Sequence, residues 1–368
     1  MKKKNLCKTL LKTICIVLGI LILALLAYIV YLYASYYRIE DNQELVVEAP
    51  VDDTTTGAAA VLATDTEYSA VTYNIGFGAY LPDYSFFMDG GTSSWAESPE
   101  TVQYAINGAG ELVKSLDPDF ALIQEIDLDA TRSYHTDEYE MLRNLLPEYT
   151  TVFAQNYDSA FLFYPFTQPH GSSRAGLGLF SKYPVSSALR RSFPISTSFS
   201  KFFDLDRCYS VSRIPVDNGK ELVIFNLHMS AYGNSDEIRK GQIEMLCNDM
   251  AKEYEAGNYV LCGGDFNHDL KASEEDAENC ESWAFPFPRT ELPEHFAFCL
   301  DLLSSEEQAA LWNSARNADM EYVPGVTYTV TLDGFIISDN IECLSYENVN
   351  TGYSYSDHDP VKVEFVLK

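Results

Sequence analysis

Residues 259–267 read Tyr-Val-Leu-Cys-Gly-Gly-Asp-Phe-Asn, an apolar run that ends in two glycines, Asp265 and Asn267. A short apolar run bounded by glycines is typical of a buried β-strand. Other apolar runs also have a polar side chain at one end; the residues are Asn74, Glu125, His228, Asp333, Asp357 and His358. Buried strands that each present a polar group at one end predict a site built on a rigid sheet.

From about residue 67 onward, such runs alternate with helical stretches. Strands are expected at Ser69–Tyr73, Phe120–Gln124, Tyr149–Phe153, Gly176–Phe180, Tyr209–Val216, Glu221–Leu227, Tyr259–Gly263, Gly334–Ile337 and Val361–Val366. Helices are expected at Pro99–Leu116, Asp137–Leu145 and Ser235–Tyr254, the last with Ser235 as its N-cap. Many strands with few helices favour an α+β domain in which two packed sheets are flanked by helices.

The polar residues at the strand ends are of the types that hydrolysis of a phosphate ester requires. Carboxylates hold hard divalent cations, histidine transfers protons near neutral pH, and asparagine donates hydrogen bonds without adding charge. Each residue alone has an ordinary interpretation: Asp265 and Asn267 suit a turn, and His228 suits a half-buried packing position. Their occurrence together favours a catalytic site.

Ordered motifs in this chain resemble those of the endonuclease/exonuclease/phosphatase family, which includes deoxyribonucleases, abasic-site endonucleases, sphingomyelinases and inositol-polyphosphate phosphatases. The motifs are Thr72-Tyr-Asn-Ile75, Gln124-Glu125, Gly176-Leu-Gly-Leu-Phe-Ser-Lys-Tyr-Pro184, Asn226-Leu-His228, Gly264-Asp-Phe-Asn267, Leu332-Asp-Gly-Phe-Ile336 and Ser356-Asp-His-Asp-Pro360. The resemblance covers roughly residues 67–368. It implies a four-layer α/β/β/α sandwich of two mostly antiparallel sheets.

The resemblance also implies a metal site. Glu125 is expected to be the principal Mg²⁺ ligand, with Asn74 and Asp357 close to the same ion or to its waters. Mn²⁺ or Ca²⁺ are the alternative ions.

The resemblance further implies catalytic roles. His358 is expected to act as general acid/base and Asp333 to orient it, as a carboxylate orients imidazole in a triad. Asp265 is expected to position or deprotonate the attacking water, while Asn267 and His228 bind phosphoryl oxygens. Whether the base is the aspartate or the histidine stays open.

The charge of the chain opposes nucleic-acid binding. The net charge is −29, and six of the 25 basic residues precede the first acidic residue, Glu40, which leaves 19 basic against 54 acidic residues from residue 39 onward. Because nucleic-acid affinity rests largely on Lys and Arg, this charge opposes DNA or RNA as a partner unless a local basic groove exists. Asn74-Ile75-Gly76 also lacks the second carboxylate that abasic-site endonucleases carry.

Several segments between the motifs bear on the substrate. Aromatic residues are frequent in residues 80–95, 161–170 and 192–203, where they either contact a lipid headgroup region or belong to the core. Arg174 is a candidate contact for a substrate phosphate, with a surface ion pair as the alternative. Arg132 and His135 leave the same two alternatives.

The N-terminus predicts a membrane anchor. An uncharged run at residues 13–37 lies between Lys12 and Arg38 and is long enough to cross a bilayer. Lysines before it predict a single-pass cell-membrane protein with residues 1–12 in the cytoplasm. Residues 38–66 are then an acidic linker, and residues 67–368 form an extracytoplasmic catalytic domain. A cleaved signal peptide is the alternative.

Together these features predict a metal-dependent phosphoesterase that acts on a phosphorylated lipid or small molecule. The alternatives are a surface-anchored nuclease and a catalytically silent binding domain of the same fold. The eight cysteines show no C-x-x-C spacing, so buried free thiols are favoured over disulfides, with Cys280–Cys299 as the most local pairing.

Overall fold

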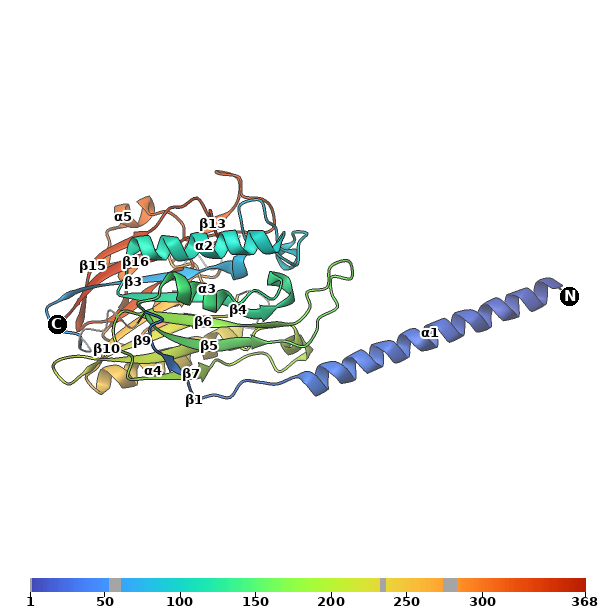
Figure 1. Ribbon diagram of the computed structural model, residues 1–368, viewed down its shortest axis with the longest axis horizontal. Coiled ribbons are helices and arrows are strands. Elements are labelled where there is room, and N and C mark those ends of the chain that lie inside the picture. The colour runs from blue at the N-terminus through green and yellow to red at the C-terminus, as the bar shows by residue number, and fades with distance from the viewer. Residues whose placement is uncertain (1, 53–60, 232–235, 274–282) are drawn as a thin grey trace. The chain divides into compact units, whose positions relative to one another are not determined.

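The computed structural model describes residues 2–52, 61–231, 236–273 and 283–368, which form two compact units, residues 1–38 and 39–368. The first unit is helix α1 (Lys2–Ser35) (Figure 1). Its residues Leu6–Ser35 reach a mean hydropathy of 3.0 and are long enough to span a membrane. A signal sequence meets the same criteria of length and composition.

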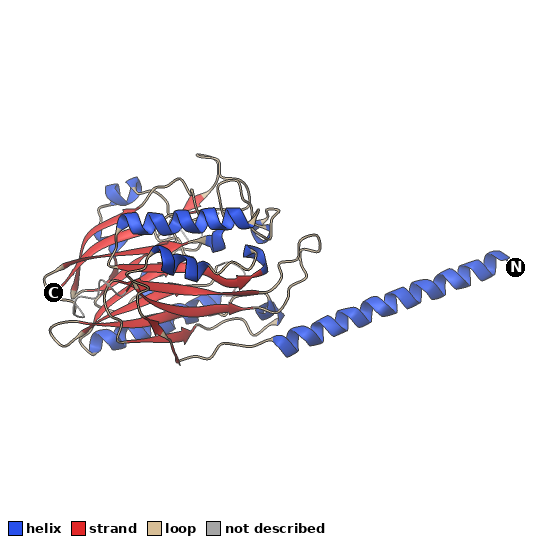
Figure 2. Cartoon of the chain, in the orientation of Figure 1, coloured by secondary structure: helices blue, strands red, loops and turns tan. Residues whose placement is uncertain are grey.

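Two large sheets make up most of the second unit (Figure 2). Within the described residues, the first sheet has seven strands in the order β1 (Gln43–Glu44), β7 (Ser187–Ser192), β8 (Cys208–Pro215), β9 (Glu221–His228), β10 (Tyr259–Asp265), β14 (Asp333–Ser338) and β11 (Phe296–Phe298). The second has the order β15 (Ile341–Asn348), β16 (Val361–Leu367), β3 (Glu67–Asn74), β4 (Phe120–Ala130), β6 (Ser173–Ser181), β5 (Thr150–Asp158) and β2 (Val47–Glu48). Strands β12 (Ala315–Arg316) and β13 (Thr329–Val330) form a small separate pair.

Both sheets are mostly antiparallel, and each contains one parallel pair near its centre. These pairs are β9 with β10 and β3 with β4. Because parallel neighbours end at the same edge of a sheet, the polar residues at their carboxyl ends lie side by side.

Helices cover the outer faces of the sheets. Helices α2 (Pro99–Leu116) and α3 (Glu138–Leu145) pack on the second sheet through a cluster that includes Val102, Leu142 and Ile123. Helix α4 (Asp236–Glu255) packs against β10, and α5 (Ser305–Ala310) is a short peripheral turn. The expected four-layer α/β/β/α sandwich is confirmed. The expected N-cap of α4, Ser235, lies outside the described residues.

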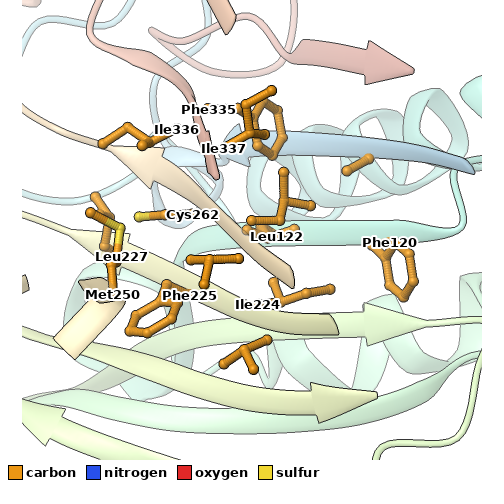
Figure 3. Packing of buried hydrophobic residues seen from close by; sticks show 14 of the residues in the cluster. Phe120, Leu122, Ile224, Phe225, Leu227, Met250, Cys262, Phe335, Ile336 and Ile337 are labelled. Atoms are coloured by element: carbon orange, nitrogen blue, oxygen red, sulfur yellow. The ribbon is translucent and has the colours of Figure 1, made fainter. Parts of the chain in front are cut away.

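The main hydrophobic core lies between the two sheets, and Figure 3 shows Leu122 of β4 near Ile224 of β9 and Phe335 of β14. The glycines of the 259–267 segment make this packing possible. A Cβ on Gly263 would lie 2.5 Å from Phe335 Cε1, and a Cβ on Gly264 would lie 2.1 Å from the carbonyl oxygen of Leu227. Gly264 also has φ +144°, so a larger residue would be both strained and obstructed there.

The structure differs from the expected linker at residues 38–66. Strand β1 pairs with β7 and β2 pairs with β5, so residues 43–48 extend one edge of each sheet. The buried side chain of Arg190 donates from Nη1 to the carbonyl oxygen of Glu40 (3.1 Å). Two-residue edge strands carry no readable period, which is why the sequence pattern did not predict them.

The cysteines that the structure describes are free thiols. Cys208, Cys247, Cys262 and Cys299 are buried, whereas Cys343 is half-buried. The suggested pairing of Cys299 with Cys280 cannot be placed, because Cys280 lies outside the described residues.

Candidate active site

The first sheet aligns three of the expected site residues by strand register. Asp265 at the end of β10 lies opposite His228 of β9 on one side and Asp333 of β14 on the other. All three are buried, and His228 Nε2 lies 3.5 Å from Asp265 Oδ2. The pattern of one polar residue at each strand end therefore becomes one row of side chains across the sheet.

The second sheet supplies Asn74 and Glu125 to the same place. The β4–β6 ladder shifts register between Ile123 and Ile126, and Glu125 within this bulge has φ +56°. A bulge of this kind re-aims a side chain out of the regular alternation of the strand. Asn74 Nδ2 donates to Glu125 Oε1 and to Asp265 Oδ2, both at 3.1 Å, and so connects the two sheets.

His358 and Asp333 form a buried pair. His358 Nδ1 lies 2.7 Å from Asp333 Oδ2, which also accepts a 2.7 Å hydrogen bond from Ser314 Oγ. Burial alone would lower the pKa of His358, but the carboxylates of Asp333 and Asp265 outweigh it and raise this pKa well above its usual value. Burial raises the pKa of Asp265. With His358 Nε2 at 3.9 Å from Asp265 Oδ2, an acid and a base face each other across a small gap.

Asn267 and His228 border the same gap. Asn267 has φ +51°, donates from its backbone N–H to Asp265 Oδ1 (2.8 Å), and donates from Nδ2 to the carbonyl oxygen of Met229 (2.9 Å). Burial, and after it the positive charge of Arg207, holds the pKa of His228 well below its usual value. A neutral His228 retains one ring N–H with which to bind an oxyanion.

The carboxylates of Glu125 and Asp357 fit a divalent cation. Both line one cavity, and burial, with a contribution from Glu125, raises the pKa of Asp357 to about 6. Gly76 leaves room beside them, since a Cβ there would lie 3.2 Å from Asp357 Oδ1. Two like charges held together at low dielectric favour a bound hard cation. Asn74 Oδ1 accepts from Gly76 N (3.0 Å) and Asn74 Nδ2 donates to Glu125 Oε1, so Asn74 directly contacts the expected metal ligand.

A second cluster of possible metal ligands, formed by Asp265, Asp333 and His358, is less suited to a metal. One ligand atom from each of Asp265, Asp333 and His358 lies within 4.8 Å of the others. His358 and Asp333 are already hydrogen-bonded to each other, however, and a protonated histidine does not bind a metal. His358 and Asp333 are therefore less available to a metal than Glu125 and Asp357 are.

Six of these side chains border a cavity of about 540 Å³; they are Glu125, His228, Asp265, Asn267, Asp357 and His358. Its wall also contains aromatic residues from segments whose role the sequence left open, among them Phe86 and Phe203. Other aromatics of those segments, such as Phe193, are core residues, and Phe166 is 84% exposed. The core interpretation is therefore confirmed for some of these aromatic residues, and contact with a lipid headgroup stays a prediction.

Among the described residues three arginines line the cavity, whereas Arg174, which was expected there, does not. Arg174 is exposed and pairs with Asp129 (Nη2–Oδ2 2.9 Å), as does His135. The lining arginines are Arg132, Arg207 and Arg316. Arg207 and Arg316 belong to no recognisable motif, so no local signal could have singled them out.

The comparisons with known proteins identify the family and agree with the fold. A model of the "Endonuclease/Exonuclease/phosphatase family" matches residues 71–302. No curated protein matches the sequence.

Solved structures share the fold at low identity. An endonuclease/exonuclease/phosphatase from Beutenbergia cavernae superposes with a TM-score of 0.54 at 15% identity, covering 82% of this chain and 72% of that one. Zebrafish (D. rerio) TDP2 in complex with a single-stranded DNA product gives 0.54 at 14%, covering 82% and 99%. The human nocturnin catalytic domain with a bound sulfate anion gives 0.53 at 17%, covering 82% and 95%.

Members of the matching family are hydrolases of phosphate ester bonds that generally use divalent metal ions. The chain belongs to the endonuclease/exonuclease/phosphatase family.

Proposed function

We propose that the chain is a Mg²⁺-dependent phosphoesterase that hydrolyses the phosphate ester of a lipid headgroup or of another small molecule outside the membrane. The observation that carries this proposal is the convergence of Glu125, His228, Asp265 and the His358–Asp333 pair on one cavity. Mn²⁺ or Ca²⁺ are the alternative ions.

The residues divide the work of an in-line displacement. Asp265 accepts a proton from the attacking water as its oxygen bonds to phosphorus, and His358 donates a proton to the leaving oxygen as the P–O bond breaks. Asn267 and His228 hold the phosphoryl oxygens. A cation bound by Glu125 and Asp357 supplies Lewis-acid stabilisation of the charge on the phosphate.

The size of the cavity and the charge of the chain support a small substrate. A volume of about 540 Å³ lies within the ~300–1,000 Å³ typical of small-molecule sites. From residue 39 onward acidic residues outnumber basic ones by 54 to 19, which opposes a long polyanion.

A surface nuclease is the second candidate, favoured by one observation: TDP2 of the same fold was solved with a single-stranded DNA product. In that case the three cavity arginines would have to overcome the acidic surface. Binding would then fall steeply with added salt.

We further propose that α1 anchors the protein with its N-terminus in the cytoplasm, which the lysines before residue 13 support. In a chain that carries a detection tag at its N-terminus, protease added to intact cells should remove the unit of residues 39–368 while the tag stays protected. Release of the large unit into the medium without protease would instead indicate a cleaved signal sequence.

The test is a hydrolysis assay on the full-length chain in detergent micelles, because residues 43–48 belong to the sheets and should not be removed. The panel is a chromogenic monoester, a chromogenic diester, sphingomyelin, phosphoinositides, single-stranded DNA and plasmid, each with Mg²⁺, Mn²⁺, Ca²⁺ or EDTA. Metal-dependent hydrolysis of lipids or small esters with plasmid intact is the expected result. Plasmid cleavage would establish the nuclease, and silence of wild type on every substrate would contradict both.

A further inference from the structure

Arg207 differs from the other buried arginines of the described residues in its hydrogen bonding. Arg132 donates to both oxygens of Asp127, Arg190 donates to backbone oxygens including that of Gln155, and Arg316 donates to the carbonyl oxygen of Leu81. The Nε and Nη1 atoms of Arg207 are buried and have no hydrogen-bond partner in the part of the chain that the structure describes.

The ion pair of Arg207 with Asp204 does not satisfy the hydrogen-bond donors of the guanidinium. Asp204 Oδ1 lies 4.0 Å from Arg207 Nε, which is too long for a hydrogen bond. The side chain of Arg207 is only 8% exposed, so water reaches it poorly. A buried guanidinium with unpaired donors is costly, and such groups in proteins generally meet a partner.

The backbone around Arg207 is fixed. Its own carbonyl oxygen accepts from Phe193 N (3.0 Å). The preceding residue, Asp206, accepts from Arg190 Nη2 through its carbonyl oxygen (2.9 Å) and from Ile39 N through Oδ2 (2.7 Å). The side chain therefore enters the cavity from a rigid support, as a binding residue requires.

Arg207 lies on the same cavity wall as the groups that we propose to bind the phosphoryl oxygens. It shares the cavity wall with His228, Asn267 and His358, and it is the charged group with the largest effect on His228. A planar guanidinium with free donors is suited to phosphate oxygens, which it can bind by two parallel hydrogen bonds.

We propose that Arg207 binds a phosphate oxyanion of the substrate in addition to the oxygens held by His228, Asn267 and the cation. This inference rests on the proposed function and narrows its substrate class. The scissile phosphate of a simple diester has only two non-bridging oxygens, which those groups already use. The third oxygen of a phosphomonoester or a second phosphate on the substrate would occupy Arg207, so the preferred substrate carries at least two negative charges.

The first test measures binding without catalysis. Thermal unfolding of the full-length chain in micelles is followed in inorganic phosphate and in chloride at equal ionic strength, with EDTA present so that metal-bound phosphate does not contribute. Wild type should be stabilised by phosphate. Arg207→Gln should lose this shift, and Arg207→Lys, which keeps the charge without the planar fork, should show a smaller one.

Arg174→Gln is the control variant, because Arg174 is an exposed arginine outside the cavity wall. Loss of the phosphate shift in Arg174→Gln with retention in Arg207→Gln would overturn the proposal. Absence of a shift in wild type would overturn it as well.

The second test locates the source of the oxyanion by kinetics with Mg²⁺ on p-nitrophenyl phosphate, bis(p-nitrophenyl) phosphate and fructose 1,6-bisphosphate. Arg207→Gln should raise KM roughly 10- to 100-fold for substrates that use it, the loss of a charge-assisted hydrogen bond. A raised KM on both the monoester and the bisphosphate would show that Arg207 binds the scissile phosphate. A raised KM on the bisphosphate alone would show that Arg207 binds a second phosphate. An equal rise in KM on the diester would contradict the proposed preference for a substrate with at least two negative charges. If no ester is hydrolysed while phosphate stabilisation still depends on Arg207, the proposed function fails and the anion site stands.

Discussion

Two clusters of buried charge have similar composition and different hydrogen bonding. In the first, which we call the closed cluster, Arg132 donates to Asp127 from Nη2 (2.8 Å) and Nε (3.1 Å), and Ser133 Oγ donates to the same carboxylate (2.8 Å). Glu138 Oε2 accepts from the backbone N–H of Asp127 (2.8 Å). The charges of Asp127 and Arg132 thus neutralise each other within the protein.

The second, the open cluster, contains Asp333, His358, Ser314 and Asp265. Ser314 and His358 both bond to Asp333 Oδ2, just as Ser133 and Arg132 both bond to Asp127 Oδ2 in the closed cluster. His358 Nε2 and Asp265 Oδ2, however, stand 3.9 Å apart at the cavity wall and do not bond to each other. The comparison shows that buried charge by itself does not identify a catalytic site. A candidate catalytic group is a buried charged group that still has a donor or acceptor atom free to bond to a ligand.

The largest expected effect comes from removing the acid of the open cluster. His358→Ala should lower kcat on any hydrolysed ester by roughly 10²–10⁴-fold while the protein remains folded, because the histidine transfers protons and contributes little packing. Steady-state kinetics and thermal unfolding of the variant check this. The matched control is His295→Ala, since His295 Nδ1 also lies 2.7 Å from Asp339 Oδ2 but on the surface. Wild-type kcat in His358→Ala would refute the assigned role.

Removing the cation of the closed cluster should affect stability. Arg132→Met leaves the Asp127 carboxylate buried without its partner and should lower the free energy of unfolding by about 3–5 kcal/mol. The guanidinium also covers the ring of Phe77, with 3.7 Å between Cζ and the ring centroid, so its loss removes packing as well. Urea unfolding measures the change. A loss below about 1 kcal/mol would mean that the pair is not structural.

The two serines give a direct comparison of the clusters, because each donates one hydrogen bond to the central aspartate. Ser133→Ala should destabilise the protein by about 1–2 kcal/mol with little change in kcat. Ser314→Ala should have a similar effect on stability but should also lower kcat about 10-fold, since Ser314 positions the aspartate that orients His358. Equal kcat in the two variants would remove the distinction between closed and open clusters.

The smallest expected effect concerns acid stability beside the closed cluster. Burial, and next the charge of Arg132, lowers the pKa of His170 to about 3 from its ordinary 6.5. Between these values the unfolded chain binds a proton that the folded protein does not, so stability falls as pH falls, by about 1.4 kcal/mol per pH unit at most. His170→Gln should make unfolding free energy less dependent on pH between 6 and 4. An unchanged slope in urea titrations would contradict this assignment.

Much of the fold was predictable because its signals are local. Helix α2 has the expected bounds, Pro99–Leu116, and its start is stabilised by Ser98 Oγ, which accepts from Thr101 N. The nine expected strands all occur, with ends shifted by a few residues. Strands such as β1 and β2 were not predicted because their two residues are ordered only by partners on β7 and β5.

In the candidate site, too, the residues that belong to local motifs could be predicted, whereas residues that act through distant partners could not. The motif residues Asn74, Glu125, His228, Asp265, Asn267, Asp333, Asp357 and His358 were recognisable by type and by place at strand ends, although their roles stay predictions. Ser314 could not be found in this way, since its role depends on hydrogen bonds to Leu332 and Asp333, eighteen and nineteen residues away.

The sequence by itself determined the family, the layered fold and the kinds of groups that meet at the site, because apolar periodicity and ordered motifs are written along the chain. The tertiary structure alone decided which charges are neutralised. Arg174, expected near the substrate, pairs with Asp129 on the surface. Arg207, which no motif singled out, is buried at the cavity, and its Nε and Nη1 have no hydrogen-bond partner among the described residues. Burial and pairing depend on partners that lie far away in sequence, as in the contact of Ser356 Oγ with the carbonyl oxygen of Asn74, and no local pattern encodes them.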